Sequence, residues 1–277
     1  MIPEFLKEML IVPEIVEAID KLGLPTEGYD PWGFSAEQSK LLYSLGVPIY
    51  RYFRPIVKGT EHIPKGRALI IGNHSGQLPF DGIVVALSTL LEADPPRLLR
   101  PLAERWVPTL PVINEVFSRA GVALGDPING RNLLEAENAI LVFPEGARGL
   151  GKTWENRYQL TNFGRGFVRL ALQTNTPIVP FAIVGAEESI VSVHNAQTLA
   201  NVLGFPYFPI PALLPLLGPL AYVPLPTRIY LTYGEPIHLE GPFDDEDSEI
   251  DKKVMVVKNK VQTMIDEGLA ARQSVFE

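Results

Sequence analysis

The chain has 277 residues, of which 46% are hydrophobic, so it can form a full core and is not a disordered chain. Its formal net charge of −8 argues against a general nucleic-acid binder and against simple electrostatic attachment to anionic lipid. It has no cysteine, which excludes disulfides, thiolate nucleophiles and cysteine-ligated zinc. The first residues show no basic stretch followed by a long apolar core, so we expect no signal peptide.

The first 56 residues are predicted to form a helical N-terminal segment. Residues 1–23 are typical of an amphipathic helix interrupted at Pro13, and the glycines and prolines of residues 23–33 indicate a loop. Ser35 and Gln38 have the spacing of a capping box, which predicts a second helix from residue 35. The two helices could pack on the main domain or form a membrane-facing hairpin, and both interpretations remain open.

From residue 56 the pattern changes to short apolar runs that alternate with helical stretches. This alternation predicts an α/β fold with a mostly parallel central sheet flanked by helices. We expect a core at residues 57–240 and a C-terminal helix, residues 241–277, packed on it. The predicted strands are residues 68–72, 97–101, 121–124, 139–143, 178–184 and 228–233, and the predicted helices are residues 82–91, 103–118, 132–137, 164–173 and 251–271.

A proline-rich stretch, residues 203–226, carries no charged side chain. Its length matches a membrane span, but its seven prolines remove backbone donors and forbid a regular helix. It is therefore either a loop packed on the core or a surface that touches lipid. We favour the lipid interpretation, because so large an apolar loop is unusual on a surface that faces water.

The first polar motif, residues 73–82, lies between a predicted buried strand and a predicted helix, where α/β sheets usually place their chemistry. It contains His74 and, seven positions later, Asp81. If the loop folds back, Asp81 accepts a hydrogen bond from one ring nitrogen and supports a charged imidazolium. The chain has no GxSxG motif, Ser75 is poorly placed next to His74, and no metal-binding motif occurs. The pair therefore predicts a general base that acts on a substrate alcohol or on water.

The second polar motif, residues 143–149, follows another predicted buried strand. Glu145 and Arg148 could form a structural ion pair. Alternatively, the turn at Gly146 could hold an anion through backbone N–H groups and the Arg148 guanidinium.

Residues 146–153, GARGLGKT, also match the Walker A pattern of nucleotide-binding loops. That pattern requires a helix that begins at the lysine, but residues 154–162 have weak helical periodicity. No later apolar run ends in an aspartate that could hold magnesium. A nucleotide site is therefore the weaker interpretation, and an anion cradle in the same loop stays plausible.

With both motifs in place, the chain resembles the glycerolipid and lysophospholipid acyltransferase family over roughly residues 57–237. Asn73, His74 and Asp81 match the first block of that family, residues 117–131 occupy the second, and Arg131 is its basic residue. Residues 143–148, FPEGAR, match the third block, and residues 177–181, PIVPF, match the fourth. Six residues separate His74 from Asp81 where the family usually has four, which is more similar to its monoacylglycerol and diacylglycerol acyltransferase-like branch.

The resemblance implies a glycerol-3-phosphate acyltransferase-like fold and a reaction. His74 would take a proton from a lipid hydroxyl, which attacks a fatty acyl thioester, and Asp81 would orient His74. Arg148, with Arg131 as a second candidate, would hold a phosphate. Glu145 would orient Arg148 or the acceptor hydroxyl, and Gly146 would belong to the same substrate-binding turn. Because Ala147 and Gly149 replace the usual hydroxyl residues of this block, the acceptor could be neutral.

The resemblance also implies partners. We expect no cofactor and no metal, with acyl-CoA or an acyl-carrier protein as co-substrate, and favour acyl-CoA because no basic docking patch for an acidic carrier is evident. A lipid acceptor, a membrane surface and a cytoplasmic location on the inner face of the membrane are expected, without nucleic acid. The remaining alternatives are an acyl thioester or ester hydrolase, the nucleotide-binding protein and a non-catalytic lipid-binding protein.

Overall fold

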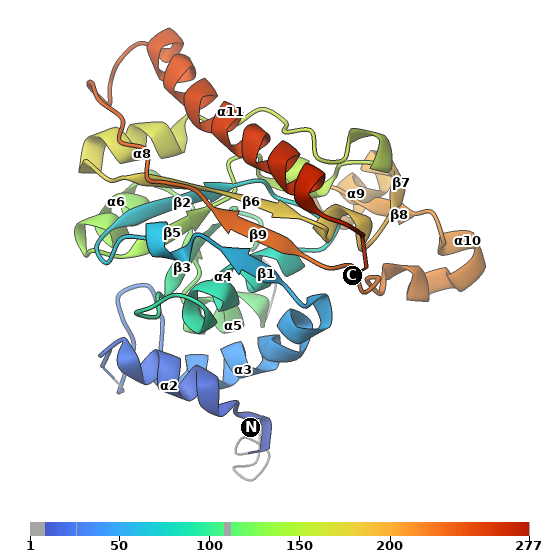
Figure 1. Ribbon diagram of the computed structural model, residues 1–277, viewed down its shortest axis with the longest axis horizontal. Coiled ribbons are helices and arrows are strands. Elements are labelled where there is room, and N and C mark those ends of the chain that lie inside the picture. Colours follow the sequence, from blue (N-terminus) through green and yellow to red (C-terminus); the bar gives the residue numbers. More distant parts are fainter. Residues whose placement is uncertain (1–8, 26, 108–111, 277) are drawn as a thin grey trace.

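A seven-stranded sheet forms the centre of the molecule (Figure 1). The computed structural model describes residues 9–25, 27–107 and 112–276. The strand order is β1-β9-β6-β2-β5-β3-β4. The strands are β1 Ile56–Lys58, β2 Ala68–Gly72, β3 Leu99–Ala103, β4 Ala123–Leu124, β5 Ala139–Val142, β6 Ile178–Val184 and β9 Tyr230–Tyr233.

The sheet is mostly parallel, as the alternating pattern predicts. Strands β6, β2, β5, β3 and β4 all run in the same direction. Only β9 and its parallel neighbour β1 run the opposite way, because β9 pairs antiparallel with β6. The carboxyl ends of five neighbouring strands therefore meet at one edge of the sheet.

Helices cover both faces of the sheet, which gives three layers (Figure 1). One face carries α2 Pro13–Lys21, α3 Ala36–Phe53, α4 Phe80–Leu91 and α5 Ile113–Arg119. The other carries α6 Pro127–Glu135, α8 Gly166–Thr174 and α11 Asp247–Ala271. The α/β fold class inferred from the sequence is thus confirmed.

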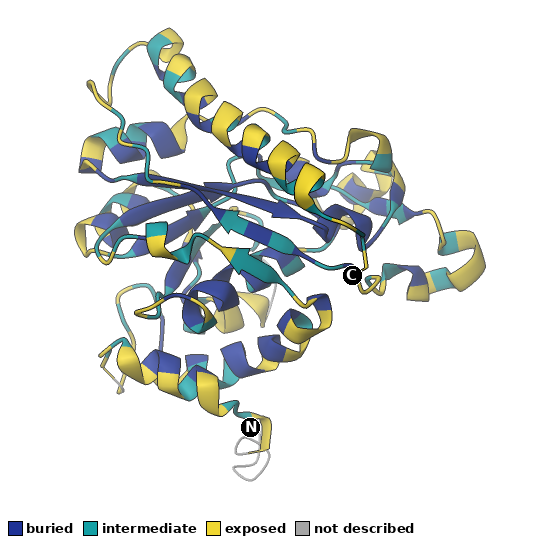
Figure 2. Cartoon of the chain, viewed as in Figure 1, coloured by how far each residue is buried: buried dark blue, intermediate teal, exposed yellow. Residues whose placement is uncertain are grey.

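The central strands are buried on both sides, as Figure 2 shows. In β2 the side chains alternate: Ala68 and Ile70 belong to the cluster under α2, α3 and α4, whereas Leu69 and Ile71 belong to the cluster under α6, α8 and α11. A strand with two buried faces has a continuous run of hydrophobic residues. For this reason residues 68–72 could be recognised from the sequence as a buried strand.

The N-terminal helices share the main core. Pro13 occupies the first turn of α2, where a missing N–H is harmless. Residues 9 and 10 are helical and residues 11 and 12 are not, so the predicted interruption lies directly before this proline. The predicted helical residues 1–8 lie outside the described residues. Ser35 caps α3 by accepting from the Gln38 N–H, but the Gln38 side chain donates to Tyr29 Oη, so only half of the predicted capping box forms. Ile15 of α2 is completely buried within the cluster that includes β2.

The predicted helix over residues 103–118 is wrong in its first part. Strand β3 continues to Ala103, since Leu102 and Ala103 pair with β4, and helix α5 begins only at Ile113. Helix α6 begins at Pro127, earlier than the predicted residue 132. Asp126 caps it by accepting from two backbone N–H groups of its first turn.

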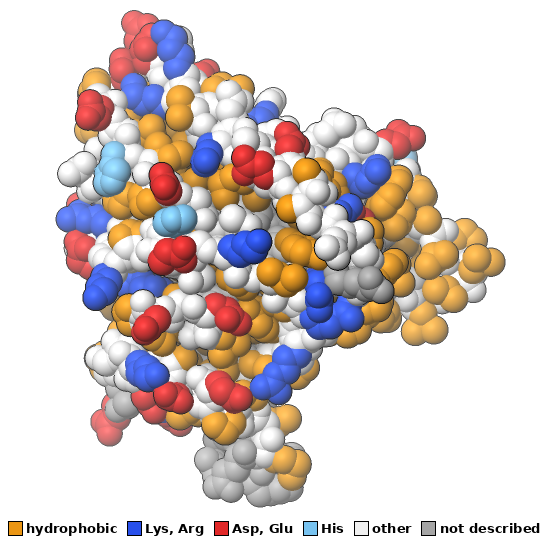
Figure 3. Space-filling view, viewed as in Figure 1, with side chains coloured by type: hydrophobic (Ala, Val, Ile, Leu, Met, Phe, Trp, Pro, Cys, Tyr) orange, Lys and Arg blue, Asp and Glu red, His pale blue; other side chains and the backbone are white. Residues whose placement is uncertain are grey.

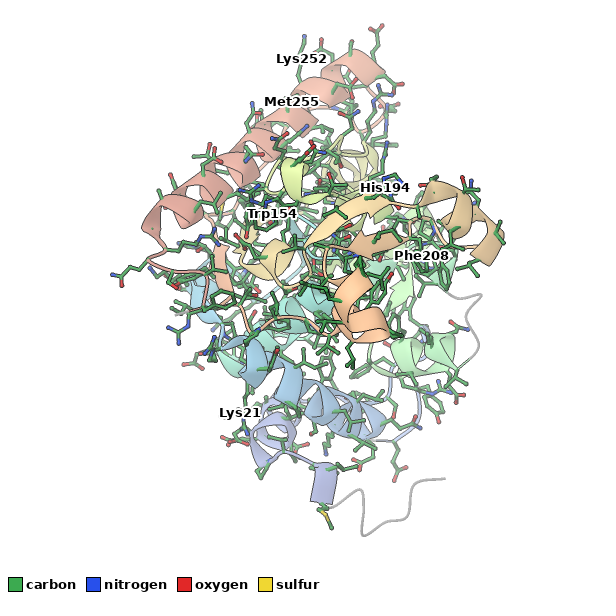
Figure 4. All side chains as sticks on the ribbon, turned by 90° about the vertical axis from the view of Figure 1, so that its right-hand side faces the viewer. Lys21, Trp154, His194, Phe208, Lys252 and Met255 are labelled. Carbon is green, nitrogen blue, oxygen red and sulfur yellow. The ribbon has the colours of Figure 1, made fainter. Side chains whose placement is uncertain are left out.

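Beyond the carboxyl edge of the parallel strands lies a region that the sequence pattern did not resolve into elements. It contains a two-stranded sheet, β7 Ser192–Asn195 and β8 Pro209–Pro211, with α9 Gln197–Leu203 and α10 Leu214–Leu217. Residues 189–227, here named the charge-free segment, contain no Lys, Arg, Asp or Glu. In Figure 4, which faces this side, the labelled His194 lies on β7 and the labelled Phe208 lies directly before β8. Among the described residues, no helix has both the length and the apolar character needed to cross a bilayer.

Candidate active site

The two polar motifs meet because they follow neighbouring parallel strands. The first motif follows β2 and the second follows β5, and these strands pair directly. Their contact is close: a Cβ atom added at Gly149 would lie 2.7 Å from His74 Cβ and 3.1 Å from Glu145 Cβ. Only a glycine lets the backbone of the second motif lie against the histidine in this way.

Asn73 anchors the start of the first motif to the sheet. Its side chain donates to the Ile183 carbonyl at 2.9 Å and accepts from the Ile183 N–H at 2.9 Å. Both amide groups of a completely buried side chain are thus satisfied by one residue of β6. This contact fixes the chain position directly before His74.

The loop folds Asp81 back onto His74 across the six-residue gap. Asp81 Oδ2 lies 2.7 Å from His74 Nδ1 and also accepts from the Ser75 N–H at 2.7 Å. Gly76, at φ +86°, makes the turn possible, and Asp81 lies in the first turn of α4. A carboxylate only accepts hydrogen bonds, so the proton resides on Nδ1 and Nε2 keeps its lone pair.

The imidazole is packed but remains open to the surface. Its ring stacks on Phe143 with a centroid distance of 4.0 Å and an angle of 15°, and its side chain is 13% exposed. Within the described residues, Nε2 has no hydrogen-bond partner, and the hydroxyl of Ser75 is buried without contacting it. The ring is thus held in place with its basic nitrogen unused, as a base for an incoming substrate requires.

Glu145 is buried against the backbone of the first motif. It is 1% exposed, and its carboxylate accepts from the His74 N–H at 3.2 Å and from the Thr161 N–H at 2.7 Å. Among the described residues it makes no contact with Arg148. Its buried contacts instead hold the backbone of the histidine.

The turn at Gly146 binds a carboxylate of the protein itself, that of Glu104. Glu104, which follows β3, accepts from the Ala147 N–H at 2.6 Å, and a side chain at Gly146 would overlap its carboxylate. The Gly146 N–H donates to the Phe143 carbonyl at 3.0 Å. It is therefore not free to bind a substrate anion, contrary to the expectation from the sequence. Arg148, on the short helix α7 Ala147–Leu150, is exposed and forms no ion pair within the described residues.

The structure does not bring Arg131 into this group. It lies on α6 and its guanidinium is 3.8 Å from Glu135 of the same helix, with 43% of the side chain exposed. No contact among the described residues joins it to His74 or Glu145.

The nucleotide-binding interpretation of residues 146–153 is wrong. No helix begins at Lys152; a short 3₁₀ turn, η3 Trp154–Asn156, follows instead. The Lys152 ammonium is buried between Glu145 and Glu187, at 3.3 and 3.2 Å, so it is already neutralised and cannot face phosphate groups.

Sequence reasoning missed three residues of this neighbourhood: Glu104, Glu187 and Tyr207. It considered Lys152 only as part of the nucleotide-binding pattern. Glu104 could have been found, because it directly follows a parallel strand, where α/β folds place functional residues. Burial raises the pKa of the Tyr207 phenol, and the carboxylates of Asp81 and Glu104 raise it further, which places this tyrosine near both motifs. Tyr207 comes from the charge-free segment, where no local pattern marked it.

Across the described ranges, no group of three or more His, Asp or Glu side chains is arranged to bind a metal ion.

Comparisons with known proteins point to the same family as the sequence motifs. Residues 54–184 match a family model described as Acyltransferase. An uncharacterised protein of Mycobacterium tuberculosis is 39% identical over 254 residues, which cover 90% of this chain and 70% of that protein. A 1-acyl-sn-glycerol-3-phosphate acyltransferase of Limnanthes alba is 30% identical over 171 residues, covering 56% of this chain and 55% of the plant protein.

A solved structure shares the fold. The 1-acyl-sn-glycerophosphate acyltransferase PlsC from Thermotoga maritima superposes with a TM-score of 0.53 over 98% of this chain and 94% of that chain. The sequence identity is 18%, so this similarity speaks to the fold alone.

Proposed function

This chain belongs to the acyltransferase family. On that premise we propose that it is a glycerolipid acyltransferase, which moves a fatty acyl group from an acyl thioester to a lipid hydroxyl with His74 as the general base. The observation that carries the proposal is the His74–Asp81 pair. Nδ1 is held at 2.7 Å by a buried carboxylate, while Nε2 is unpaired within the described residues.

The proposed reaction has two steps. His74 Nε2 takes the proton of the acceptor hydroxyl as its oxygen attacks the thioester carbonyl, which gives a tetrahedral oxyanion. The C–S bond then breaks, and the departing thiolate receives the proton from the imidazolium. The products are an ester and a free thiol, and the histidine returns to its starting state. Asp81 stabilises the transient imidazolium, because the two charges are in direct contact.

Arg148 is the proposed phosphate-binding residue. It is exposed beside the site and unpaired among the described residues, and a guanidinium suits the phosphate of a lysophospholipid or of coenzyme A. Arg131 is the weaker candidate, because its guanidinium lies beside a glutamate of its own helix. No basic docking patch for an acidic carrier protein is evident in the sequence, and this supports acyl-CoA as the donor.

We further propose that the protein acts on the cytoplasmic face of the membrane, bound to its surface through the charge-free segment. Several leucines of this segment are strongly exposed, with Leu216 at 82% and Leu220 at 67%. Exposed leucines without neighbouring charges are suited to the acyl boundary of a bilayer. The segment also supplies Tyr207, so a lipid-bound segment would lie next to the reacting groups.

The test replaces the proposed base. His74→Ala removes the general base, a contribution typically of 10²–10⁴ in rate, so turnover should fall at least about a hundredfold with the fold intact. Products are measured by mass spectrometry after mixing the protein with acyl-CoA and separate lysophospholipid, monoacylglycerol and diacylglycerol acceptors.

The matched control is His238→Ala, which changes an exposed histidine outside both polar motifs and outside the charge-free segment and should retain full turnover. Near-normal acyl transfer by His74→Ala would disprove the assignment. Release of free fatty acid at the same rate with and without acceptor would instead identify a hydrolase.

A further inference from the structure

Lys152 is buried directly behind the proposed base. It is 6% exposed, and its ammonium lies 3.3 Å from Glu145 Oε2 and 3.2 Å from Glu187 Oε1. Both carboxylates are themselves buried, at 0 and 4% side-chain exposure. A charged group in such surroundings persists only when it is paired, so the three side chains depend on one another.

One end of this group holds His74. Glu145 Oε1 accepts from the His74 backbone N–H, and Glu145 Oε2 accepts from the Thr161 N–H. Both hydrogen bonds are strongest while the carboxylate is ionised. Without a cation beside it, a buried carboxylate tends to bind a proton or to move. Lys152 therefore preserves the acceptor that fixes the main chain of the histidine.

The same lysine also contacts the loop between His74 and Asp81 and, through Glu187, the chain at Tyr158. Gln77, within the loop between His74 and Asp81, donates to the Lys152 carbonyl at 2.8 Å. Glu187 accepts from the Tyr158 N–H at 2.8 Å. Burial raises the pKa of Glu187, whereas the Lys152 ammonium lowers it. The two glutamates would repel each other if the cation were lost.

We propose that Lys152 is a positioning residue for acyl transfer: its ammonium holds the Glu145 carboxylate in place, and Glu145 in turn holds the backbone of His74 against Asp81. This inference rests on the proposed function of His74. Lys152 is buried between two carboxylates of the protein itself, so its loss should lower kcat while KM stays nearly constant.

The test compares Lys152→Met with Arg272→Gln. Arg272 forms a partly buried ion pair with Glu188, the residue next to Glu187, but has no described contact with Glu145 or His74. We expect Lys152→Met to lower kcat about tenfold to a hundredfold with KM within about twofold, as displaced reacting groups do. Arg272→Gln should lower the melting temperature and leave kcat within about twofold of the wild type.

A second measurement does not depend on activity. Selective ¹⁵N-histidine labelling gives four backbone amide signals, because the chain has four histidines. The His74 signal, identified by its absence in His74→Ala, should shift in Lys152→Met while the other three stay in place. This shift would show that Lys152 fixes the His74 backbone, whereas the activity of the His74 variant tests the proposed function separately.

If Lys152→Met does not fold, the double variant Lys152→Met/Glu187→Gln replaces it, because the amide removes the repulsion between the two glutamates. The same loss of kcat and the same amide shift are then expected. The proposal is wrong if kcat stays within twofold of the wild type, if Arg272→Gln lowers kcat equally, or if the His74 amide signal does not move.

Discussion

At the scale of single residues, the site depends on which nitrogen of His74 carries the proton. The Asp81 carboxylate makes two hydrogen bonds of 2.7 Å with one oxygen, to the imidazole and to the Ser75 N–H. It is fully buried, so no water competes for it. The carboxylate thereby decides both the tautomer and the direction of the ring, with Phe143 stacked on the ring face.

Asp81→Asn tests this arrangement. The amide oxygen can still accept from Ser75, but the amide is neutral and balances no positive charge on the imidazole. We expect kcat to fall about a hundredfold or more with little change in melting temperature. Steady-state kinetics and circular dichroism measure the two quantities. Unchanged turnover would mean that another group orients the histidine.

At the scale of elements, two turns after adjacent strands bring the motifs together. The turn after β2 carries His74, and the turn after β5 lies against it through the backbone of Gly149. A Cβ atom at Gly149 would lie 3.0 Å from the His74 carbonyl oxygen and closer still to His74 Cβ. The contact between the two elements therefore has no room for a methyl group.

Gly149→Ala should consequently separate the turns. We expect a loss of about 1–3 kcal/mol in the free energy of unfolding, as overpacking usually causes, together with reduced turnover. Gly166→Ala is the matched control, because no atom lies within 4 Å of a Cβ added there. Its stability should stay within about 1 kcal/mol of the wild type in a denaturant titration. Equal behaviour of the two variants would contradict the close contact.

At the scale of the whole molecule, apolar surface is concentrated at one end. Figure 3 shows hydrophobic side chains gathered over the projecting part that carries α10, whereas charged side chains are spread over the rest of this face. The charge-free segment, which carries β7, β8, α9 and α10, lies beyond the carboxyl edge of the sheet (Figure 1). His74 and Asp81 lie at the same edge, because they follow the end of β2. One orientation on a membrane would thus bring lipid and the proposed base together.

Leu216→Asp/Leu220→Asp tests the proposed lipid contact. Both leucines are exposed, so the fold should tolerate the change, while binding to phosphatidylcholine vesicles should fall at least about tenfold. Because the segment has no charge, wild-type binding should persist in about 0.5 M salt, where charge interactions are screened beyond about 4 Å. Co-sedimentation with vesicles measures both.

The control for this experiment is Met255→Asp, which changes an exposed apolar side chain of α11 (labelled in Figure 4). It should leave vesicle binding unchanged, and the leucine variant should keep its turnover on a short-chain, water-soluble acceptor. If the leucine variant binds vesicles as the wild type does, the lipid contact lies elsewhere.

The sequence by itself determined the type of fold and the chemical groups at its centre. Runs such as residues 68–72 and 178–184 are buried on both faces, so their apolar character alone marked them as strands of a parallel sheet. The histidine and aspartate were recognisable because they lie at a strand-to-helix junction, a local feature of the chain. The sequence also showed that Asp81 could reach His74 only if the six residues between them fold back.

Only the tertiary structure decided which groups the motifs contact. Glu145 was expected to face the substrate, yet it turns inward to the His74 N–H, and Lys152, part of a nucleotide-like pattern, neutralises it. Glu104 and Tyr207 come from segments distant in sequence. Such contacts join strand ends and loops that only folding brings together, so their partners leave no periodic signal in the chain.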